Sequence, residues 1–233
     1  MKISSHFISP LLHFFYPHNC IGCGSDIIES ENFLCLECIN NLPHTSFSLH
    51  ANNPVEKMFW GRIAIIAGMS EFYFSKASIV QNLIHELKYK GNKKAGIYLG
   101  NLMGKSLKNS NRFANIDLLV PLPLFTKKEF KRGYNQAEVL CQGIAEEMKV
   151  PLLTKNVIRI IHTETQTKKG RIQRWENVEK SFSVLDPAFL KGKHVLLVDD
   201  VITTGATMEA CGAEILKVAQ VKLSVATLAF ATR

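Results

Sequence analysis

Long hydrophobic runs are absent from this 233-residue sequence, and so are internal repeats and low-complexity tracts. No apolar run approaches the roughly 18 residues that a membrane-spanning helix needs, which argues against a helical membrane protein. The first residues, MKISSHFISPLLHFFYP, look at first like a signal peptide, but Pro10 and His13 interrupt the apolar part and no small-residue cleavage site follows. We therefore expect a cytoplasmic protein without a membrane span, in which residues 7–15 form a short amphipathic helix.

Acidic residues are outnumbered by basic ones, 20 against 28, so the formal net charge is +8. The charge is distributed unevenly, because residues 1–50 hold one Lys and four acids, a net charge of −3. The remaining 27 Lys or Arg and 16 Asp or Glu give the rest of the chain a net charge of +11. A basic body suits a polyanionic ligand, either a phosphorylated metabolite or a nucleic acid, although a solvated basic surface explains this charge equally well.

Cysteine is scarce, with six residues, yet four of them form two closely spaced pairs. Cys20 and Cys23 are separated by two residues, and so are Cys35 and Cys38, with eleven residues between the pairs. Two such pairs can place four thiolates around one tetrahedral ion, for which Zn²⁺ is the usual occupant. Disulfides are the alternative, but they fit poorly with a chain that lacks an export signal. The spacing predicts a structural zinc site with no open coordination position.

The pattern after residue 50 predicts an α/β fold. Residues 62–69 and 71–74 are expected to form paired strands, and helices are expected over 79–91 and 93–108, the second of them weakened by its glycines. Further strands without polar alternation are predicted at 117–123, 155–161, 195–198 and 221–231, with helices over 135–149 and 205–218. This order indicates a parallel sheet covered on both faces. We expect a zinc module over residues 1–50 and an α/β domain over residues 55–233, with Cys141 and Cys211 in its core.

One stretch, HVLLVDDVITTGATM (194–208), points to a ligand. Asp199 and Asp200 follow an apolar strand, and parallel α/β sheets bind ligands beyond the carboxyl ends of their strands. The next residues form a turn into a helix, whose free amides and hydroxyls can hold a phosphate monoester. They are Thr203, Thr204, Gly205, Ala206 and Thr207. The carboxylates would repel that phosphate, so we expect them beside it, on sugar hydroxyls or on Mg²⁺ held through water. The stretch predicts a sugar phosphate ligand.

The same stretch resembles the signature of type I phosphoribosyltransferases, which bind 5-phosphoribosyl-1-pyrophosphate (PRPP). The four-cysteine spacing and three further segments resemble the ComF family, which combines a small zinc module with a phosphoribosyltransferase-like domain and is linked to competence and DNA uptake. The segments are LIHELKYKG (83–91), VPLPLFTKKEFKRGYNQAEVL (120–140) and TQTKKGRIQRWENVEKSF (165–182). The resemblance covers nearly the whole chain and implies a type I phosphoribosyltransferase-like domain over 55–233.

The resemblance also implies a role for each candidate residue. Residues 203–207 would hold the 5′-phosphate of PRPP. The catalytic set would be Asp199 and Asp200, which face the ribose 2′ and 3′ hydroxyls with Mg²⁺, and Arg132, which binds the pyrophosphate. The basic loop that contains Arg132 and the segment 162–181, which matches a flexible lid, would add further cations. They are Lys131, Arg171 and Arg174, with Lys88 either in the site or capping its helix.

Three functions stay open at this point. The first is a PRPP-dependent transferase that displaces pyrophosphate onto an unknown acceptor. The second is a non-catalytic module that binds PRPP or a nucleotide and acts on the DNA-uptake machinery, such as its helicase. The third is an adaptor that binds single-stranded DNA through the zinc module and the basic body, although the basic loops lack interleaved aromatic residues. The resemblance implies a hood and a loop after the strand 221–231 that recognise the acceptor, and because the printed sequence ends at Arg233 any hood is expected from residues 1–110.

Overall fold

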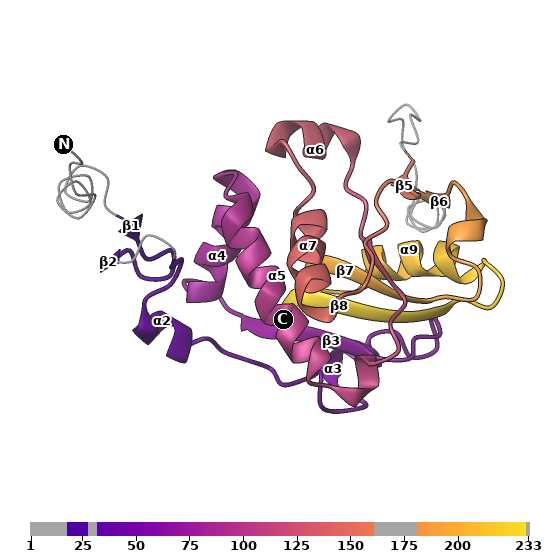
Figure 1. Cartoon of the computed structure of the whole chain (residues 1–233), viewed down its shortest axis with the longest axis horizontal. Helices are drawn as coiled ribbons and strands as arrows, with labels where there is room; N and C mark the ends of the chain where they lie inside the picture. The colour runs from indigo at the N-terminus through magenta and orange to yellow at the C-terminus, as the bar shows by residue number, and fades with distance from the viewer. Residues whose placement is uncertain (1–17, 28–31, 161–180, 232–233) are drawn as a thin grey trace, which may run out of the picture.

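The computed structural model describes residues 18–27, 32–160 and 181–231, and its centre is a four-stranded parallel sheet in the order β3-β8-β7-β4 (Figure 1). The strands are β3 (Gly68–Phe74), β4 (Leu118–Pro121), β7 (His194–Ile202) and β8 (Lys222–Ala231). The central strands β7 and β8 consist almost entirely of buried residues, as expected of strands covered on both faces. The predicted α/β class with a parallel sheet is confirmed.

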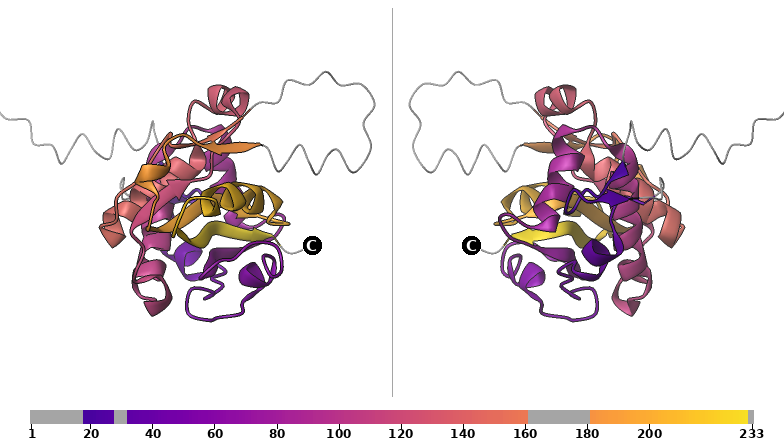
Figure 2. Two further views of the ribbon diagram at one scale, coloured as in Figure 1. Left: turned by 90° about the vertical axis from the view of Figure 1, so that its right-hand side faces the viewer. Right: turned by 90° about the vertical axis from the view of Figure 1, so that its left-hand side faces the viewer.

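Helices cover both faces of this sheet (Figures 1 and 2). One face carries α4 (Ile79–Tyr89), α5 (Lys93–Lys108) and α7 (Gln136–Met148), and the other carries α9 (Ala206–Leu216). Three short helical turns lie in the connections, namely α3 (Pro54–Lys57), η1 (Asn111–Phe113) and η2 (Pro187–Phe189). Cys141 and Cys211 are fully buried, which confirms their predicted place in the core. Among the described residues, no helix has the length and hydrophobicity to cross a bilayer.

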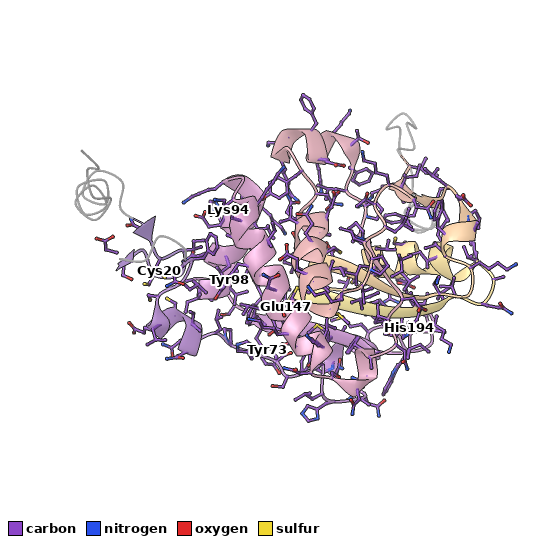
Figure 3. All side chains as sticks on the ribbon, in the orientation of Figure 1. Cys20, Tyr73, Lys94, Tyr98, Glu147 and His194 are labelled. Atoms are coloured by element: carbon purple, nitrogen blue, oxygen red, sulfur yellow. The ribbon has the colours of Figure 1, made fainter. Side chains whose placement is uncertain are left out.

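The glycines of α5 have a packing role that outweighs their low helix propensity. A Cβ atom at Gly100 would lie 2.2 Å from the carbonyl oxygen of Leu140, and one at Gly143 of α7 would lie 2.2 Å from the carbonyl oxygen of Ile97. Glu147 of α7, labelled in Figure 3, lies over Gly104 in the same way. The two helix backbones therefore approach more closely than larger side chains would allow, and this contact offsets the propensity cost.

The prediction of paired strands at 62–69 and 71–74 is wrong. These residues contain one strand, β3, which lies parallel to β8, and residues 62–67 form no strand. Only one residue, Ser70, separates the two runs, and this connection is shorter than the two-residue loop of a tight hairpin, so the chain does not reverse there. The outer edge of β3 is instead covered by the segment around His44, which forms an antiparallel bridge with Phe72.

Two segments near the sheet also differ from expectation. The strand predicted at 155–161 does not join the parallel sheet, because β5 (Val157–Arg159) pairs antiparallel with β6 (Phe182–Val184) in a separate ribbon. The basic loop after β4 is not a loop, since it contains the helix α6 (Thr126–Arg132), which buries none of its residues. Both elements stand above the sheet in Figure 1. The alternation of strands and helices in the sequence does not predict where such elements outside the sheet lie.

The cysteine-containing part comprises β1 (His18–Asn19), β2 (Asp26–Ile27) and α2 (Leu36–Asn40). It lies at one end of the molecule, beside α4, whose Asn82 side chain donates a hydrogen bond to the carbonyl oxygen of Gly22 at 2.8 Å. Cys20 and the start of β7 at His194 are at opposite ends in Figure 3. Leu34 and Cys38 belong to the same contiguous core as the sheet, and the domain division at residues 50–55 stays a prediction. The helix predicted at 7–15 lies outside the described residues.

Candidate functional site

Asp199 and Asp200 lie near the carboxyl end of β7, one residue apart and therefore on opposite faces of the sheet. The strand continues through both residues to Ile202, so it is longer than the predicted 195–198. Asp200 is buried, with 8% of its surface exposed, and its Oδ2 atom lies 2.9 Å from Nζ of Lys88. A buried carboxylate needs such a partner, because an unpaired charge at this depth would cost several kcal/mol.

Lys88 comes from the last turn of α4, and its contact with Asp200 brings it to the end of β7 where the sequence predicts the site. The end of α4 is fixed in place by Tyr134, whose hydroxyl donates a hydrogen bond to the carbonyl oxygen of Leu87. The next residue, Tyr89, is 67% exposed and lies beside the ring of His85, with 5.0 Å between the ring centroids. Residues 85–89 thus bring a cation and an exposed aromatic ring to the carboxyl end of the sheet.

The carboxyl group of Asp199 is held in an environment that disfavours its charge. Burial and the neighbouring Asp200 raise the pKa of Asp199 to about 8. Its Oδ1 atom accepts a hydrogen bond from the backbone N–H of Asp200 at 2.8 Å, which lowers the pKa only in part. Asp199 is therefore protonated in most of the protein molecules at neutral pH.

Residues 203–207 form the turn into α9 that the sequence predicts. Gly205 is the N-cap residue, with a φ angle of 74°, which lies in the left-handed region that glycine adopts without strain. Gly205 has no side chain to accept hydrogen bonds from the first turn, so the N–H of Ala206 donates to the Thr204 hydroxyl and the next amides of α9 have no side-chain cap from Gly205. Thr203 and Thr204 are exposed, and the Thr204 hydroxyl lies 3.4 Å from the backbone nitrogen of Ala206.

Arg132 and Lys131 occupy the last turn of α6. Arg132 Nη1 donates a hydrogen bond to Oε1 of Gln136 at 2.6 Å, and its guanidinium carbon lies 6.0 Å from the ring centroid of Tyr89. Arg132 therefore lies close to the end of α4 that carries Lys88. Lys131 is exposed on the same helix. Arg171 and Arg174, the predicted lid residues, lie outside the described residues.

Arg159 is a residue at this site that the sequence reasoning missed. Its guanidinium carbon lies 3.7 Å from the ring centroid of Phe125 and 5.1 Å from that of Phe182. Its Nε atom is buried without a hydrogen-bond partner among the described residues, and burial lowers the pKa of Arg159. The positive charge of Arg159 opposes part of the rise in the pKa of Asp199, so the two groups share one electrostatic environment. A single Arg inside an apolar strand gives no motif, although its place just before the lid segment was a usable signal.

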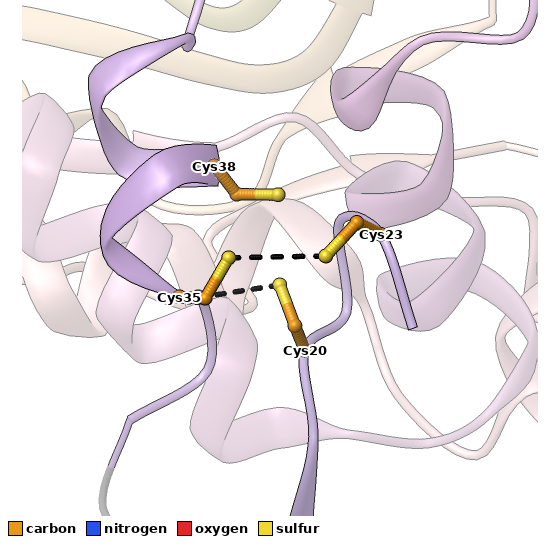
Figure 4. Close-up of side chains that lie close together, drawn as sticks. All are labelled: Cys20, Cys23, Cys35 and Cys38. Atoms are coloured by element: carbon orange, nitrogen blue, oxygen red, sulfur yellow. Dashed lines mark hydrogen bonds between the residues drawn. The ribbon is translucent and has the colours of Figure 1, made fainter. Parts of the chain in front are cut away.

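The four cysteines predicted to bind zinc are brought together (Figure 4). Their sulfur atoms all lie within 4.8 Å of one another, and those of Cys23 and Cys35 are 3.8 Å apart. Tetrahedral Zn–S bonds of about 2.3 Å separate sulfurs by about 3.8 Å, so the donor set and its spacing fit Zn²⁺. A hydrogen bond from the Ser25 hydroxyl lowers the pKa of Cys23 to about 6, whereas burial raises the pKa of Cys38. A dication would offset half of the charge of four such thiolates.

Replacing one of these thiols tests the metal site. We expect Cys35→Ser to lose most of its bound zinc and to make residues 18–40 sensitive to limited proteolysis, because structural zinc contributes folding free energy directly. Metal content measured by atomic emission and far-UV circular dichroism are the readouts, and the sheet domain should keep its spectrum. Ser25→Ala, which keeps all four thiols, is the matched control. Full zinc retention by Cys35→Ser would refute the four-thiolate assignment.

The raised pKa of Asp199 predicts a pH-dependent stability. In the unfolded chain this group titrates near pH 4, whereas in the folded protein it holds its proton up to about pH 8. Folding therefore takes up a proton between these values, and the stability that Asp199 contributes falls as the pH rises through this window. Asp199→Asn removes this loss, so its melting temperature should exceed the wild-type value by a few degrees at pH 8 and by less at pH 5.

Thermal unfolding at both pH values measures this difference, with Glu129→Gln on the exposed helix α6 as control. An equal difference at both pH values contradicts the assigned protonation.

Comparison with known proteins places the chain in a family. A sequence model described as "Phosphoribosyl transferase domain" matches residues 135–233. The chain is 28% identical over 210 residues to Competence protein F of Haemophilus influenzae, covering 83% of this chain and 89% of that protein. It is 28% identical over 193 residues to DNA utilization protein YhgH of Escherichia coli, covering 81% and 80%. Among solved structures it is similar to glutamine PRPP amidotransferase from B. subtilis, with a TM-score of 0.42 and 16% identity over 60% of this chain and 30% of the other. The chain belongs to the ComF/YhgH family, with a four-cysteine cluster near its N-terminus and a phosphoribosyl transferase domain.

Proposed function

We propose that this protein binds PRPP and transfers its phosphoribosyl group to an acceptor, with displacement of pyrophosphate, as part of DNA handling in the cytoplasm. The observation that carries the proposal is the order of charges along the carboxyl edge of the sheet. The amino end of α9 offers amides, the acids of β7 follow, and the cations of α4, α6 and β5 come next. PRPP has the complementary order, since its hydroxyl edge lies between two anionic ends.

The 5′-phosphate is assigned to residues 203–207. The backbone N–H groups at the start of α9 and the hydroxyls of Thr203, Thr204 and Thr207 supply donors, and the helix dipole favours a negative charge there. Gly205 allows the phosphate to approach the backbone closely. The ring of Phe59 lies behind this turn, where a Cβ atom on Gly205 would be 3.3 Å from it.

The ribose hydroxyls are assigned to the two acids. Asp200 accepts hydrogen bonds as a carboxylate, and Asp199 loses its proton when a donor or a cation arrives. Oxygen donors of this kind suit Mg²⁺, which would neutralise charge on the pyrophosphate when bound. Lys88 occupies the position next to Asp200 and is placed to move from the carboxylate to an oxygen of the ligand.

The pyrophosphate is assigned to Arg132, Lys131 and Arg159, with Arg171 and Arg174 as proposed lid residues. Planar guanidinium groups bind phosphate oxygens with two parallel hydrogen bonds, and Arg159 has an unpartnered Nε atom among the described residues. In the reaction, the bond between C1 of the ribose and the pyrophosphate oxygen breaks, and a bond from C1 to the acceptor forms. The acceptor gives up one proton. The protein contributes position and charge, because cations stabilise the leaving group as its charge develops.

Asp200→Asn tests the proposed function. We expect the affinity for PRPP with Mg²⁺, measured by calorimetry, to fall about 10- to 100-fold, because a charge-assisted hydrogen bond contributes about 1.5–3 kcal/mol. Pyrophosphate release across a panel of nucleobases and nucleic acids is the activity readout. Glu214→Gln, which makes the same charge change at the far end of α9 next to Lys217, is the control. Unchanged PRPP affinity in Asp200→Asn would remove the site, and binding without pyrophosphate release would favour a non-catalytic module.

A second candidate function is the binding of single-stranded DNA, which one observation favours. Phe130 on α6 is 91% exposed and lies between Glu129 and Lys131 on a helix that also carries Lys127 and Lys128, and Tyr89 lies beside Arg132. The expectation that basic segments lack aromatic residues is therefore wrong for α6. Exposed rings among cations are typical of surfaces that stack bases and neutralise phosphates. Such a surface at the mouth of the site would suit a partner of DNA-uptake proteins such as a helicase.

Phe130→Ala tests this second candidate. Its affinity for a labelled oligothymidine, measured by fluorescence anisotropy, should fall about 5- to 150-fold, because stacking of one base contributes about 1–3 kcal/mol. Binding by the wild-type protein should weaken as salt rises. Leu185→Ala, which also removes an exposed apolar side chain, should bind as the wild type does. Undetectable or salt-independent binding by the wild type would rule the function out.

A further inference from the structure

The segment that follows α3 reaches across to the turn that begins α9. Phe59 is fully buried and its ring lies against Gly205, although 146 positions separate the two residues in the sequence. The same segment ends in Arg62, whose side chain is 31% exposed. This segment lies outside residues 135–233, where the phosphoribosyl transferase domain is matched. The phosphate-binding turn is therefore supported by a part of the chain far from it in sequence.

Arg62 makes three contacts, of which one is within its own segment and two connect this segment to the turn and to α9. Its Nη1 atom donates hydrogen bonds to the carbonyl oxygens of Met58 at 3.0 Å and Thr204 at 3.2 Å. Its Nη2 atom forms an ion pair with the carboxylate of Glu209, in the first turn of α9. One planar guanidinium thus joins its own segment, the turn and the helix, which a flexible point charge such as Lys does less well.

The contact with Thr204 sets the direction of a backbone amide. In a trans peptide the N–H points away from the C=O of the same peptide group. Because the carbonyl oxygen of Thr204 is held by Arg62, the N–H of Gly205 points to the opposite side. An anion held over the turn on that side would accept a hydrogen bond from this amide. Loss of Arg62 would leave the peptide group free to rotate.

The contact with Glu209 removes an unfavourable charge. Glu209 lies in the first turn of α9, where a carboxylate interacts well with the helix dipole but repels a phosphate bound at the same helix end. The ion pair with Arg62 offsets this repulsion. The contacts of Arg62 with Thr204 and with Glu209 therefore affect the same property, which is the affinity of the turn for a phosphate group.

We propose that Arg62 is a positioning residue for phosphate binding at residues 203–207: it orients the Gly205 amide and neutralises Glu209, without touching the ligand. The inference rests on the proposed function and extends it to a residue outside the matched domain. It makes a selective prediction. Binding of a phosphate monoester at the turn depends on Arg62, whereas binding of pyrophosphate at α6 and Arg159 does not.

Calorimetry on the full-length, zinc-loaded protein with two separate probes tests this. Arg62→Met should weaken binding of ribose 5-phosphate about tenfold or more and leave binding of inorganic pyrophosphate within about twofold of the wild type. Arg62→Lys, which keeps the charge but not the planar fork, should bind ribose 5-phosphate with an affinity between those of the wild type and Arg62→Met. Lys57→Met, which removes a cation from the same segment beside Trp60, should behave like the wild type.

A double substitution separates positioning from a purely structural effect. Glu209→Gln in the Arg62→Met background should recover part of the lost affinity for ribose 5-phosphate, since it removes the carboxylate that Arg62→Met leaves unpaired. The inference is overturned if Arg62→Met lowers only the melting temperature, or if both probes weaken equally. It is also overturned if Arg62→Lys, tested in case Arg62→Met does not fold, shows wild-type affinity. If the wild-type protein binds neither probe, the proposed function fails and this role with it.

Discussion

The ion pair between Lys88 and Asp200 is the contact on which the site depends, because it joins two segments that the sequence keeps 112 positions apart. A carboxylate with 8% exposure cannot remain charged without a compensating group, and Lys88 reaches it only if α4 ends where it does. The hydrogen bond from Tyr134 to Leu87 holds that end, and Tyr134 in turn precedes the N-cap residue of α7. The charge at the strand end is thus compensated by the helix α4, whose end is held by a residue that immediately precedes the N-cap of α7.

The carboxyl edge of the sheet has an order of charges that none of its elements has alone. The start of α9 is positive through its amides, the β7 acids are negative or neutral, and α4, α6 and β5 add Lys88, Arg132 and Arg159. Burial and the neighbouring Asp200 raise the pKa of Asp199, so the free site carries less negative charge than its composition suggests. The proposed ligand, with anionic ends and hydroxyls between them, would meet a partner group at each position.

The first half of the chain completes a site whose signature lies in the second half. The matched domain begins at residue 135, yet Lys88, Tyr89 and Arg62 all precede it. Close packing of α5 and α7 through their glycines joins the two halves, because it places α4 and α7 on the same face of the sheet. The cysteine cluster is attached to this half through Asn82 of α4. We therefore expect that changes in the N-terminal half can affect the turn at residues 203–207 without altering its residues.

The sequence by itself determined the parallel sheet, the start of α9 at Gly205 and the cysteine cluster, because each depends on residues that are close together in the chain. Buried strands, a helix start and paired cysteines are local patterns with strong physical causes. Only the tertiary structure decided that β3 is a single strand, that β5 leaves the sheet for a ribbon, and that Lys88, Arg62 and Arg159 face the site. Those features depend on which distant segments meet, and a lone charged residue in a helix or strand gives no sign of the partner that packing will bring to it.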